Sequence, residues 1–204
     1  MLRHPKKPMG FRWLQQFLAP DSAWRDMVLS LGLAVVLAGV CHAAVAEARY
    51  IPSGSMLPTL QVGDRVLIEK LSYHLTLPRR GDIVVFTPPT AVEAYGYDTS
   101  IPWIKRVIAL PGEKVAIASG RVWINGRAMQ EGYLDEPPRY AMDERIVPRG
   151  HLFVLGDNRN HSIDSHVWGT VPLAHIIGRA SFRFWPLAQA GNLADPPENL
   201  ALRP

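Results

Sequence analysis

The residues best suited to chemistry lie in three short segments, and the first holds two serines around a glycine. This segment, residues 51–60, has the sequence IPSGSMLPTL, with a proline on each side of the Ser53-Gly54-Ser55 step. Proline restrains the backbone and glycine allows close approach of another chain, so a hydroxyl on this turn is both fixed and accessible. Ser53 and Ser55 are therefore candidate nucleophiles, although the local composition also suits a plain polar turn.

The second segment places a lysine inside an apolar run. Residues 103–113 have the sequence WIKRVIALPGE, which predicts a β-strand around Lys105. A lysine in such a strand either extends its amine to water or loses its proton, because burial disfavours the ammonium ion. A neutral lysine is a base that can accept the proton of a serine hydroxyl without a histidine. Strand alternation alone would leave Lys105 facing solvent, so both outcomes stay open.

The third segment is a dense polar loop, residues 156–169, with the sequence GDNRNHSIDSHVWG. Such a loop after an apolar strand can support an active site or form a tight turn. It lacks the central glycine and the final glutamate of an EF-hand calcium loop. The seven histidines form no HExxH motif and no Cys/His cluster, so we predict neither a metal nor another cofactor.

A rival arrangement is a Ser/His/Asp triad of Ser55, His161 and Asp164, since triads are defined by geometry and not by sequence order. It leaves Lys105 without a role. A Ser-x-x-Lys motif is excluded because Pro58 occupies the lysine position, and the sequence has no Gly-x-Ser-x-Gly elbow.

The elements that must position these segments are predominantly β-strands. Runs rich in Val, Ile and Phe, bounded by Gly, Pro and Asp, predict strands. They cover residues 65–69, 82–87, 103–109, 114–118, 152–155 and 176–185. Ser119-Gly120 and Asn125-Gly126 predict hairpin turns, whereas residues 88–102 and 133–149 are expected to be loops. No helical apolar period of useful length follows residue 46, so we predict a mainly β body.

An uncharged apolar stretch precedes this body. Residues 27–46, MVLSLGLAVVLAGVCHAAVA, carry no formal charge if His42 is neutral. As a helix they would extend about 30 Å, the thickness of a bilayer core, which predicts one transmembrane helix. Basic residues before it favour a cytoplasmic N-terminus and place the rest of the chain across the membrane. The alternative is a cleaved signal peptide, because Ala44-Val45-Ala46 has the small-x-small form of a cleavage site.

The net charge of +4 and the pI near 9.4 would suit a nucleic-acid-binding protein, but the distribution of charge argues against this class. Residues 1–26 hold five basic and two acidic side chains, whereas the remaining 178 residues hold 17 basic and 16 acidic ones. The excess positive charge therefore lies before the predicted span. The single cysteine, Cys41, lies inside that span, so no disulfide is available to the body.

Four segments together resemble the sequence motifs of one protein family. SGSMLPTL, RRGDIVVF, KRVIALPGE and GDNRNHSIDSHVWG follow the order found in the bacterial type I signal peptidases, which are membrane-anchored serine proteases with a Ser/Lys dyad. The resemblance extends from about residue 51 to residue 185. It implies a signal-peptidase-like β-fold and an endopeptidase that removes N-terminal signal peptides from exported preproteins after a small-x-small (AxA) motif.

The resemblance also implies roles for individual residues. Ser55 corresponds to the nucleophile and Lys105 to the general base, while the Ser53 hydroxyl and the Ser55 backbone N–H correspond to the oxyanion hole. The implied supporting residues are Ser162, which would orient the lysine, Asp164, His166, and the structural pair Asp157 and Arg106. Ile51 and Ile104 correspond to the walls of shallow apolar pockets that accept small substrate residues.

The implied organisation has a basic cytoplasmic tail (1–26), a transmembrane helix (27–46), an extracytoplasmic β catalytic domain (47–185) and a proline-rich C-terminal tail (186–204). A reduced second β-subdomain would lie within the catalytic domain, at about 114–150. The implied partners are preprotein signal peptides and the lipid bilayer, with the secretion translocon nearby. The implied location is the bacterial cytoplasmic (inner) membrane, with the catalytic domain on the outer (periplasmic) face.

Two features depart from the family pattern. His166 stands where many members have an arginine, two residues after Asp164. Arginine is always charged, whereas histidine is ordinarily charged only below about pH 6.5, so His166 would give Asp164 a weaker, pH-dependent partner. The segment between Glu113 and Gly150 is short, which is why the second β-subdomain is expected to be reduced.

Two other functions remain open from the sequence. A specialised peptidase of the same clan would mature a pilin or a single secreted partner, and a membrane-anchored β-domain would bind exported proteins without cleaving them. A further open point is the N-terminal tail, which would suit either an interfacial amphipathic helix or a disordered segment. Its apolar residues are Phe11, Trp13, Leu14, Phe17 and Leu18.

Overall fold

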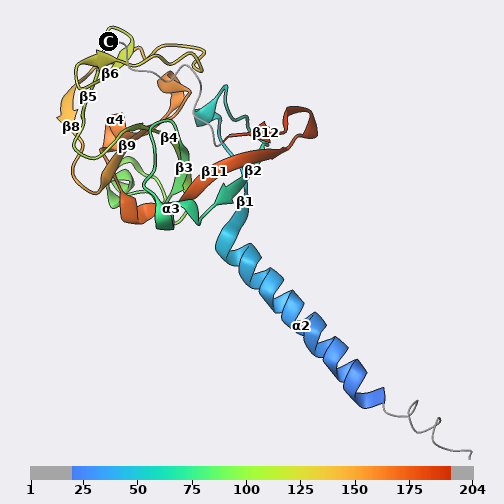
Figure 1. The fold of residues 1–204 in the computed structure, drawn as a ribbon. Coiled ribbons are helices and arrows are strands. Elements are labelled where there is room, and N and C mark those ends of the chain that lie inside the picture. The colour runs from blue at the N-terminus through green and yellow to red at the C-terminus, as the bar shows by residue number, and fades with distance from the viewer. Residues whose placement is uncertain (1–19, 194–204) are drawn as a thin grey trace, which may run out of the picture. The chain divides into compact units, whose positions relative to one another are not determined.

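The computed structural model describes residues 20–193, and the chain divides into two units, Met1–Ala43 and Ala44–Pro204 (Figure 1). Helix α2 (Pro20–Val45) accounts for the described part of the first unit. It begins at a proline, whose fixed φ suits the first turn of a helix. Residues 11–18, for which the sequence left an interfacial helix and a disordered segment open, lie outside the described residues.

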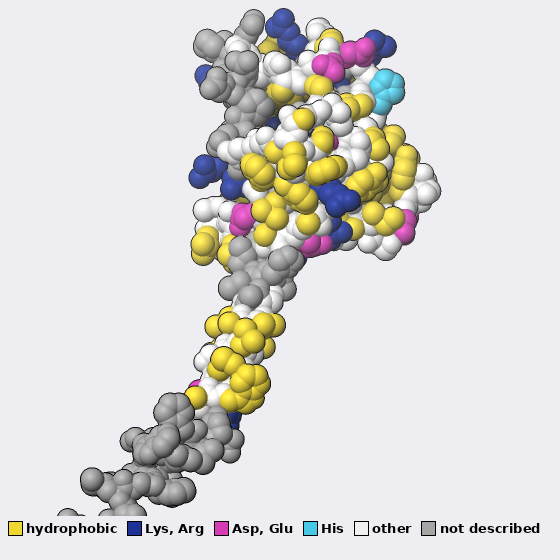
Figure 2. Space-filling model, turned by 90° about the vertical axis from the view of Figure 1, so that its right-hand side faces the viewer, with side chains coloured by type: hydrophobic (Ala, Val, Ile, Leu, Met, Phe, Trp, Pro, Cys, Tyr) yellow, Lys and Arg dark blue, Asp and Glu magenta, His cyan; other side chains and the backbone are white. Residues whose placement is uncertain are grey.

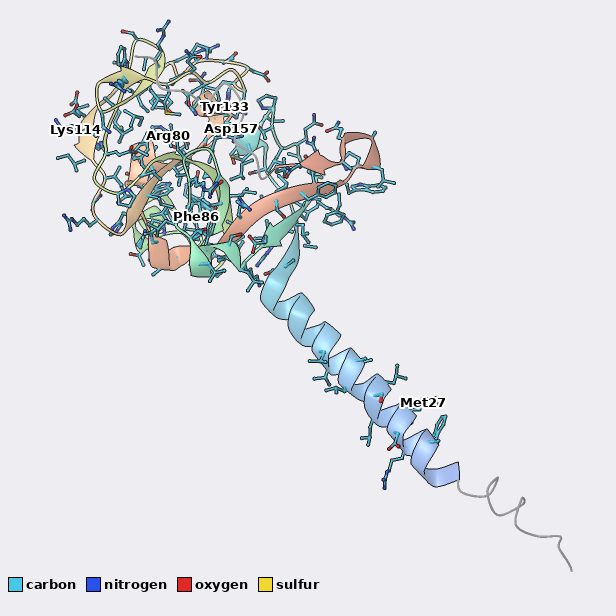
Figure 3. The ribbon with its side chains drawn as sticks, viewed as in Figure 1. Met27, Arg80, Phe86, Lys114, Tyr133 and Asp157 are labelled. Atoms are coloured by element: carbon cyan, nitrogen blue, oxygen red, sulfur yellow. The ribbon has the colours of Figure 1, made fainter. Side chains whose placement is uncertain are left out.

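Helix α2 covers nearly all of the predicted span. It includes Met27, labelled in Figure 3, and ends at Val45, one residue before the predicted end of the span. The large apolar side chains from Trp24 to Leu37 are exposed, and Figure 2 shows them along the helix. Within residues 20–193, no helix combines the length and the apolar character that a membrane crossing requires.

The body is built on an antiparallel sheet of eight strands. In spatial order these are β1 (Ala46–Tyr50), β2 (Arg65–Glu69), β11 (Ile176–Trp185), β3 (Ile83–Phe86), β4 (Trp103–Ala109), β9 (His151–Leu155) and β10 (Val171–Pro172), with β12 (Gly191–Asn192) also paired to β11. Strand β4 is hydrogen-bonded on both edges, to β3 and to β9. Every residue of β4 after Trp103 is buried, which places Lys105 and Arg106 in the interior.

A second antiparallel sheet lies between Lys114 and Ile146. Its strands, in spatial order, are β7 (Arg127–Ala128), β6 (Arg121–Ile124), β5 (Lys114–Ala118) and β8 (Met142–Ile146). Ser119 and Asn125 each adopt a positive φ of 52°, and each is followed by a glycine with positive φ. Two successive residues of positive φ are typical of a tight type I′ hairpin turn, so both predicted turns are confirmed.

Short helical turns connect the strands. They are η1 (Gly54–Met56), α3 (Ser72–Leu75), η2 (Thr90–Tyr95), η3 (Arg159–His161), α4 (Ser165–Trp168), η4 (Leu173–His175) and η5 (Leu187–Gln189). The best-defined cap is at α4, where the Asp164 side chain accepts a hydrogen bond from the backbone N–H of His166. An aspartate at this position satisfies an N–H that the short helix leaves unpaired.

The core consists of three apolar clusters, and strand alternation decides which residue joins which. On β3, Ile83 and Val85 pack in a cluster with Met56, whereas Val84 and Phe86 pack in a cluster with Trp168. The third cluster joins the two sheets. Its members include Ile108, Ile117, Ile124, Met142 and Phe153. The smaller sheet is therefore attached to the larger one through a shared core.

The prediction of a mainly β body is confirmed, and the structure adds strands that the sequence patterns missed. Strand β8 lies in a segment expected to be a loop, because only Met142 of its five residues is buried and no alternation is visible. Ala46, expected to end the span, instead pairs with Glu69 as the first residue of β1. Strand β12 occupies part of the segment expected to be a tail, and the division at residues 27, 47 and 186 stays a prediction.

Gly178 provides a test of how tightly β11 packs against its neighbour. A Cβ atom at this position would lie 2.5 Å from the Glu69 carbonyl oxygen and 2.8 Å from Ile68 Cγ2. We expect Gly178→Ala to lower the free energy of unfolding by about 1–3 kcal/mol, because β11 and β2 must separate to admit the methyl group. Urea unfolding followed by tryptophan fluorescence measures this change.

The matched control is Gly191→Ala, because a Cβ at Gly191 meets no atom within 4 Å. It should change the free energy of unfolding by less than about 0.5 kcal/mol. Equal effects of the two substitutions would contradict the close packing of Gly178.

Candidate active site

The serine turn is held in place by the polar loop that follows β9. The backbone N–H of Asn158 donates to the carbonyl oxygen of Ser55 at 3.1 Å, and the Asn158 side-chain amide donates to that of Gly54 at 3.0 Å. Ser55 lies in η1, directly after the Ser53-Gly54 step. The Ser53 and Ser55 hydroxyl oxygens are 3.4 Å apart. Two predicted segments, about one hundred residues apart in sequence, therefore meet at Ser55.

Lys105 reaches the same point from β4. Its Nζ donates a hydrogen bond to Ser55 Oγ at 2.7 Å, and only 5% of the residue is exposed. The side chain is almost entirely buried, because β4 is a central strand with both edges paired and its residues from Ile104 onward buried. The sequence left open whether the Lys105 amine extends to water or is buried, and the structure shows that it is buried.

The environment of Lys105 favours its neutral form. Desolvation lowers the pKa of the amine to about 8, and the charges of Asp164 and Asp157 act in the opposite direction. A base with a pKa near the working pH is present in the neutral form often enough to accept a proton. The Lys105 and Ser55 pair therefore has the geometry and the proton affinity of a base and its nucleophile.

Gly156 allows the two sides of the site to touch. A Cβ atom there would lie 2.4 Å from the Ser55 carbonyl oxygen and 2.3 Å from Ser162 Oγ. Only glycine fits between them. The Ser162 hydroxyl is buried and makes no hydrogen bond in the described part of the chain, so its predicted bond to Lys105 is not formed in this structure.

Below the serine turn, a buried ion pair joins β4 to the loop. The Arg106 guanidinium binds Asp157 through two hydrogen bonds of 2.8 Å and 2.6 Å. Thr59 also donates to Asp157, at 2.6 Å. The Tyr133 ring lies 4.3 Å from the guanidinium carbon, and Figure 3 labels Tyr133 beside Asp157. The structure thus brings the predicted pair Asp157 and Arg106 together.

A second ion pair extends this network. Arg159 binds Glu131 through bonds of 2.9 Å and 2.6 Å, and its Nε donates to the carbonyl oxygen of Gly156. Glu131 was not predicted from the sequence, because nothing in its neighbourhood distinguishes it from a surface glutamate. A buried charge is tolerated only when its hydrogen bonds are satisfied, and here each guanidinium has a carboxylate partner.

Asp164 connects the loop to His166. One carboxylate oxygen accepts the backbone N–H of Gly156 at 2.9 Å, and the other lies 2.6 Å from His166 Nδ1. Because a carboxylate only accepts, His166 Nδ1 carries the proton of this bond. The ring of Tyr140 stacks on His166, with centroids 4.1 Å apart. Tyr140 lies in the expected loop and was not predicted to contribute.

An apolar cleft of about 320 Å³ opens beside the reactive pair. Ile104 lines it, but the other predicted pocket residue, Ile51, does not, since Ile51 is only 2% exposed and packs in the core. The wall also contains residues that the sequence motifs did not indicate. These are Tyr97, Ile101, Pro102, Trp103 and Ile163. Trp103 could have been found, because it lies two residues from Lys105 and so on the same side of the strand.

The rival triad is not assembled. His161 Nδ1 lies 3.1 Å from the side-chain oxygen of Asn158, and both oxygens of Asp164 bond to other partners. Across residues 20–193, no group of three or more His, Cys, Asp or Glu side chains is arranged to hold a metal ion.

Comparison with known proteins places this chain in a family. Residues 24–185 match the family model described as signal peptidase, peptidase S26. The chain belongs to this family. It is 52% identical over 177 residues to "Signal peptidase I" of Leptolyngbya laminosa, covering 87% of each chain, and 53% identical to "Probable signal peptidase I-1" of Synechocystis, covering 83% of this chain and 86% of the relative. The resemblance drawn from the motifs is thereby confirmed.

A solved signal peptidase I from Enterococcus faecalis is 30% identical and covers 52% of this chain and 98% of its own, with a TM-score of 0.43. Membership of the signal peptidase family confirms the prediction of a serine peptidase, and hence of a hydrolase.

Burial of Lys105 should have a measurable cost in stability. Its pKa is about 8 in the folded chain against 10.5 in the unfolded one, so the unfolded chain binds more protons between these values. The penalty is full below pH 8 and disappears above about pH 10.5. We expect Lys105→Met to raise the free energy of unfolding by up to about 3 kcal/mol at pH 7, and progressively less as the pH rises.

Urea unfolding of the wild type and Lys105→Met at pH 7, 9 and 10.5 measures this difference. Lys114→Met is the control, because Lys114 is exposed and pairs with Glu144 at the surface. A gain at Lys105 that does not decline with rising pH would contradict a depressed pKa.

Proposed function

We propose that this chain is a membrane-bound serine endopeptidase that removes N-terminal signal peptides from exported preproteins. The observation that carries the proposal is the 2.7 Å hydrogen bond between Lys105 Nζ and Ser55 Oγ, made by an amine whose pKa desolvation lowers to about 8. Membership of the signal peptidase family supports the substrate class. The arrangement needs no histidine, and His161 bonds elsewhere.

The proposed reaction has two stages. Neutral Lys105 accepts the Ser55 proton while Ser55 Oγ attacks the scissile carbonyl, and the resulting oxyanion is stabilised by the Ser53 hydroxyl and the Ser55 backbone N–H. Lys105 then returns the proton to the leaving amine, which leaves an acyl group on Ser55. Water enters, Lys105 accepts one of its protons, and the acyl-enzyme is hydrolysed. The free enzyme is regenerated when the proton returns to Ser55.

The remaining site residues act on the position of this pair. Asp157 and Arg106 fix the loop against β4, and Asp164 holds the Gly156 backbone that touches Ser55. Ser162, beside the same glycine, is proposed to orient the amine once substrate is bound. An unpaired buried hydroxyl is costly, which makes such a bond favourable when it can form.

The cleft supports a preference for small residues at the −1 and −3 positions of the signal peptide. Trp103 and Tyr97 meet edge to face, with ring centroids 5.5 Å apart, and both line the cleft with Ile104. Rigid rings of this kind narrow a pocket and reject large side chains by overlap. Ile51, proposed from the resemblance to contribute to the same pockets, would have to act from beneath the surface.

The dyad is tested by cleavage of a preprotein with an AxA site. Ser55→Ala and Lys105→Ala should each lower kcat by at least about 1,000-fold, because nucleophile and base act as one unit. The double variant should lose no more than either single one. Processing of the preprotein is followed by mass spectrometry, which also locates the cut.

His161→Ala is the matched control and should retain cleavage within about threefold, because His161 makes only a surface contact to Asn158. Loss of activity in this variant, with activity kept in Lys105→Ala, would favour the triad. Cleavage of one special substrate and not of a generic one would indicate a specialised peptidase.

We further propose that residues 27–46 anchor the enzyme in the bacterial cytoplasmic membrane, with the N-terminus in the cytoplasm and the catalytic body on the outer face. The support is the uncharged sequence of this stretch and the basic residues before it. Tethering would confine enzyme and signal peptide to one plane and raise their effective concentration. The translocon, which delivers preproteins to the same plane, would then lie nearby.

The anchor is tested by fractionation and by mass. The protein should stay in the membrane pellet after alkaline carbonate treatment, and its intact mass should include residues 1–46. Replacement of Leu33 and Val36, both exposed on α2, by lysine should release it, because a charge at the centre of a span is costly. A mature chain that starts at Glu47 would contradict the anchor.

A further inference from the structure

His166, two residues after Asp164, is held by a hydrogen bond at one ring nitrogen and by an aromatic ring stacked on its face. His166 Nδ1 lies 2.6 Å from Asp164 Oδ1, and the Tyr140 ring stacks on the imidazole at an interplanar angle of 19°. We propose that His166, clamped between Tyr140 and Asp164, is a positioning residue that sets how much of the Asp164 charge is felt at Lys105. The inference rests on the proposed function, because it concerns the base of the same dyad.

The contacts of the clamp come from two parts of the chain. Asp164 and His166 are the N-cap and the second residue of α4, so their bond is local and fixed by the helix start. Tyr140 comes from the segment that precedes β8, about 25 residues earlier in the chain. An aromatic ring stacked on an imidazole restricts its rotation, and the proton of Nδ1 therefore stays directed at the carboxylate.

The carboxylate at the other end of this bond is connected to the serine turn through Gly156. Asp164 is fully buried, and its second oxygen holds the Gly156 backbone that touches Ser55. Its negative charge raises the pKa of Lys105, against the larger lowering by desolvation. In a buried site such a charge is only weakly screened by solvent. A group that neutralises the Asp164 charge therefore lowers the pKa of Lys105, and the amine is then neutral at a lower pH.

The sign of the effect follows from charge alone. A permanent cation at position 166 would cancel more of the Asp164 charge and lower the pKa of Lys105, whereas a neutral donor would cancel less. The titratable group of the clamp besides His166 and Asp164 is the Tyr140 hydroxyl. Its pKa is also affected by the charges of Arg159 and Glu131, which act in opposite directions. Burial, together with the negative charge of Asp164, raises the pKa of Tyr140, so this hydroxyl stays neutral throughout the working range.

The test is the pH dependence of kcat/KM for an AxA peptide, measured with the full chain in detergent from pH 5 to pH 10. His166→Arg supplies a fixed cation and His166→Gln a fixed neutral donor. The acid limb of His166→Arg should lie at least about half a pH unit below that of His166→Gln, the size expected for one charge acting across a partly screened site. The plateau rates at high pH should agree within a few-fold.

Tyr140 gives a second, independent pair of variants. Tyr140→Phe keeps the stacked ring and should reproduce the wild-type profile. Tyr140→Leu removes the ring and should move the acid limb to higher pH, because a freely rotating imidazole cancels less of the Asp164 charge. This pair also tests the clamp if His166→Arg does not fold. His175→Gln is the control, because His175 bonds to the Thr87 carbonyl and should leave the profile unchanged.

Coincident acid limbs for His166→Arg and His166→Gln, with both variants active, would overturn the proposal. So would equal profiles of Tyr140→Phe and Tyr140→Leu. Failure of the proposed function is distinguishable from either result, because in that case Ser55→Ala or Lys105→Ala would still cleave while the position 166 variants behaved normally.

Discussion

The structure depends on burying an amine almost completely, at the base of an open cleft. Lys105 lies on a strand paired on both edges, and its only hydrogen-bond acceptor in the described contacts is the hydroxyl of Ser55. Desolvation costs free energy in the folded chain, and the same cost makes the amine a base. The apolar clusters on either side of β3 and β4, and the ion pairs below the serine turn, compensate for that cost and hold the hydroxyl in reach.

The two neighbouring basic side chains of β4, Lys105 and Arg106, have different hydrogen-bond partners. Arg106, the residue after Lys105, is equally buried but receives a carboxylate through two hydrogen bonds, so it remains a cation. Lys105 receives a hydroxyl and no carboxylate within bonding distance in the described contacts. The difference explains why one basic side chain serves as a structural tie and the other as a candidate base.

Much of the fold was accessible from sequence, because its strands are runs of β-branched residues between turn residues. Strand β4 and both hairpin turns of the smaller sheet were found in this way. Strand β8 was not, since four of its five residues are exposed and only pairing with β5 defines it. Likewise Ser55 and Lys105 lie in recognisable sequence motifs. Tyr140 and Glu131 lie in no such motif, and only their contacts with residues distant in sequence connect them to the site. The burial of Ile51 also could not be inferred, because its neighbours are set by tertiary packing.

The alternation of Lys105 and Arg106 has a consequence for how the site is assembled. Consecutive residues of a strand point to opposite faces, so a slip of β4 by one residue would direct the guanidinium toward Ser55 and the amine toward Asp157. Such a chain would hold every residue of the site yet have no base, since a guanidinium does not give up its proton. Hydrolytic activity would therefore require the correct register of β4. A chain with a shifted register would be inactive, and would not cleave other proteins without specificity.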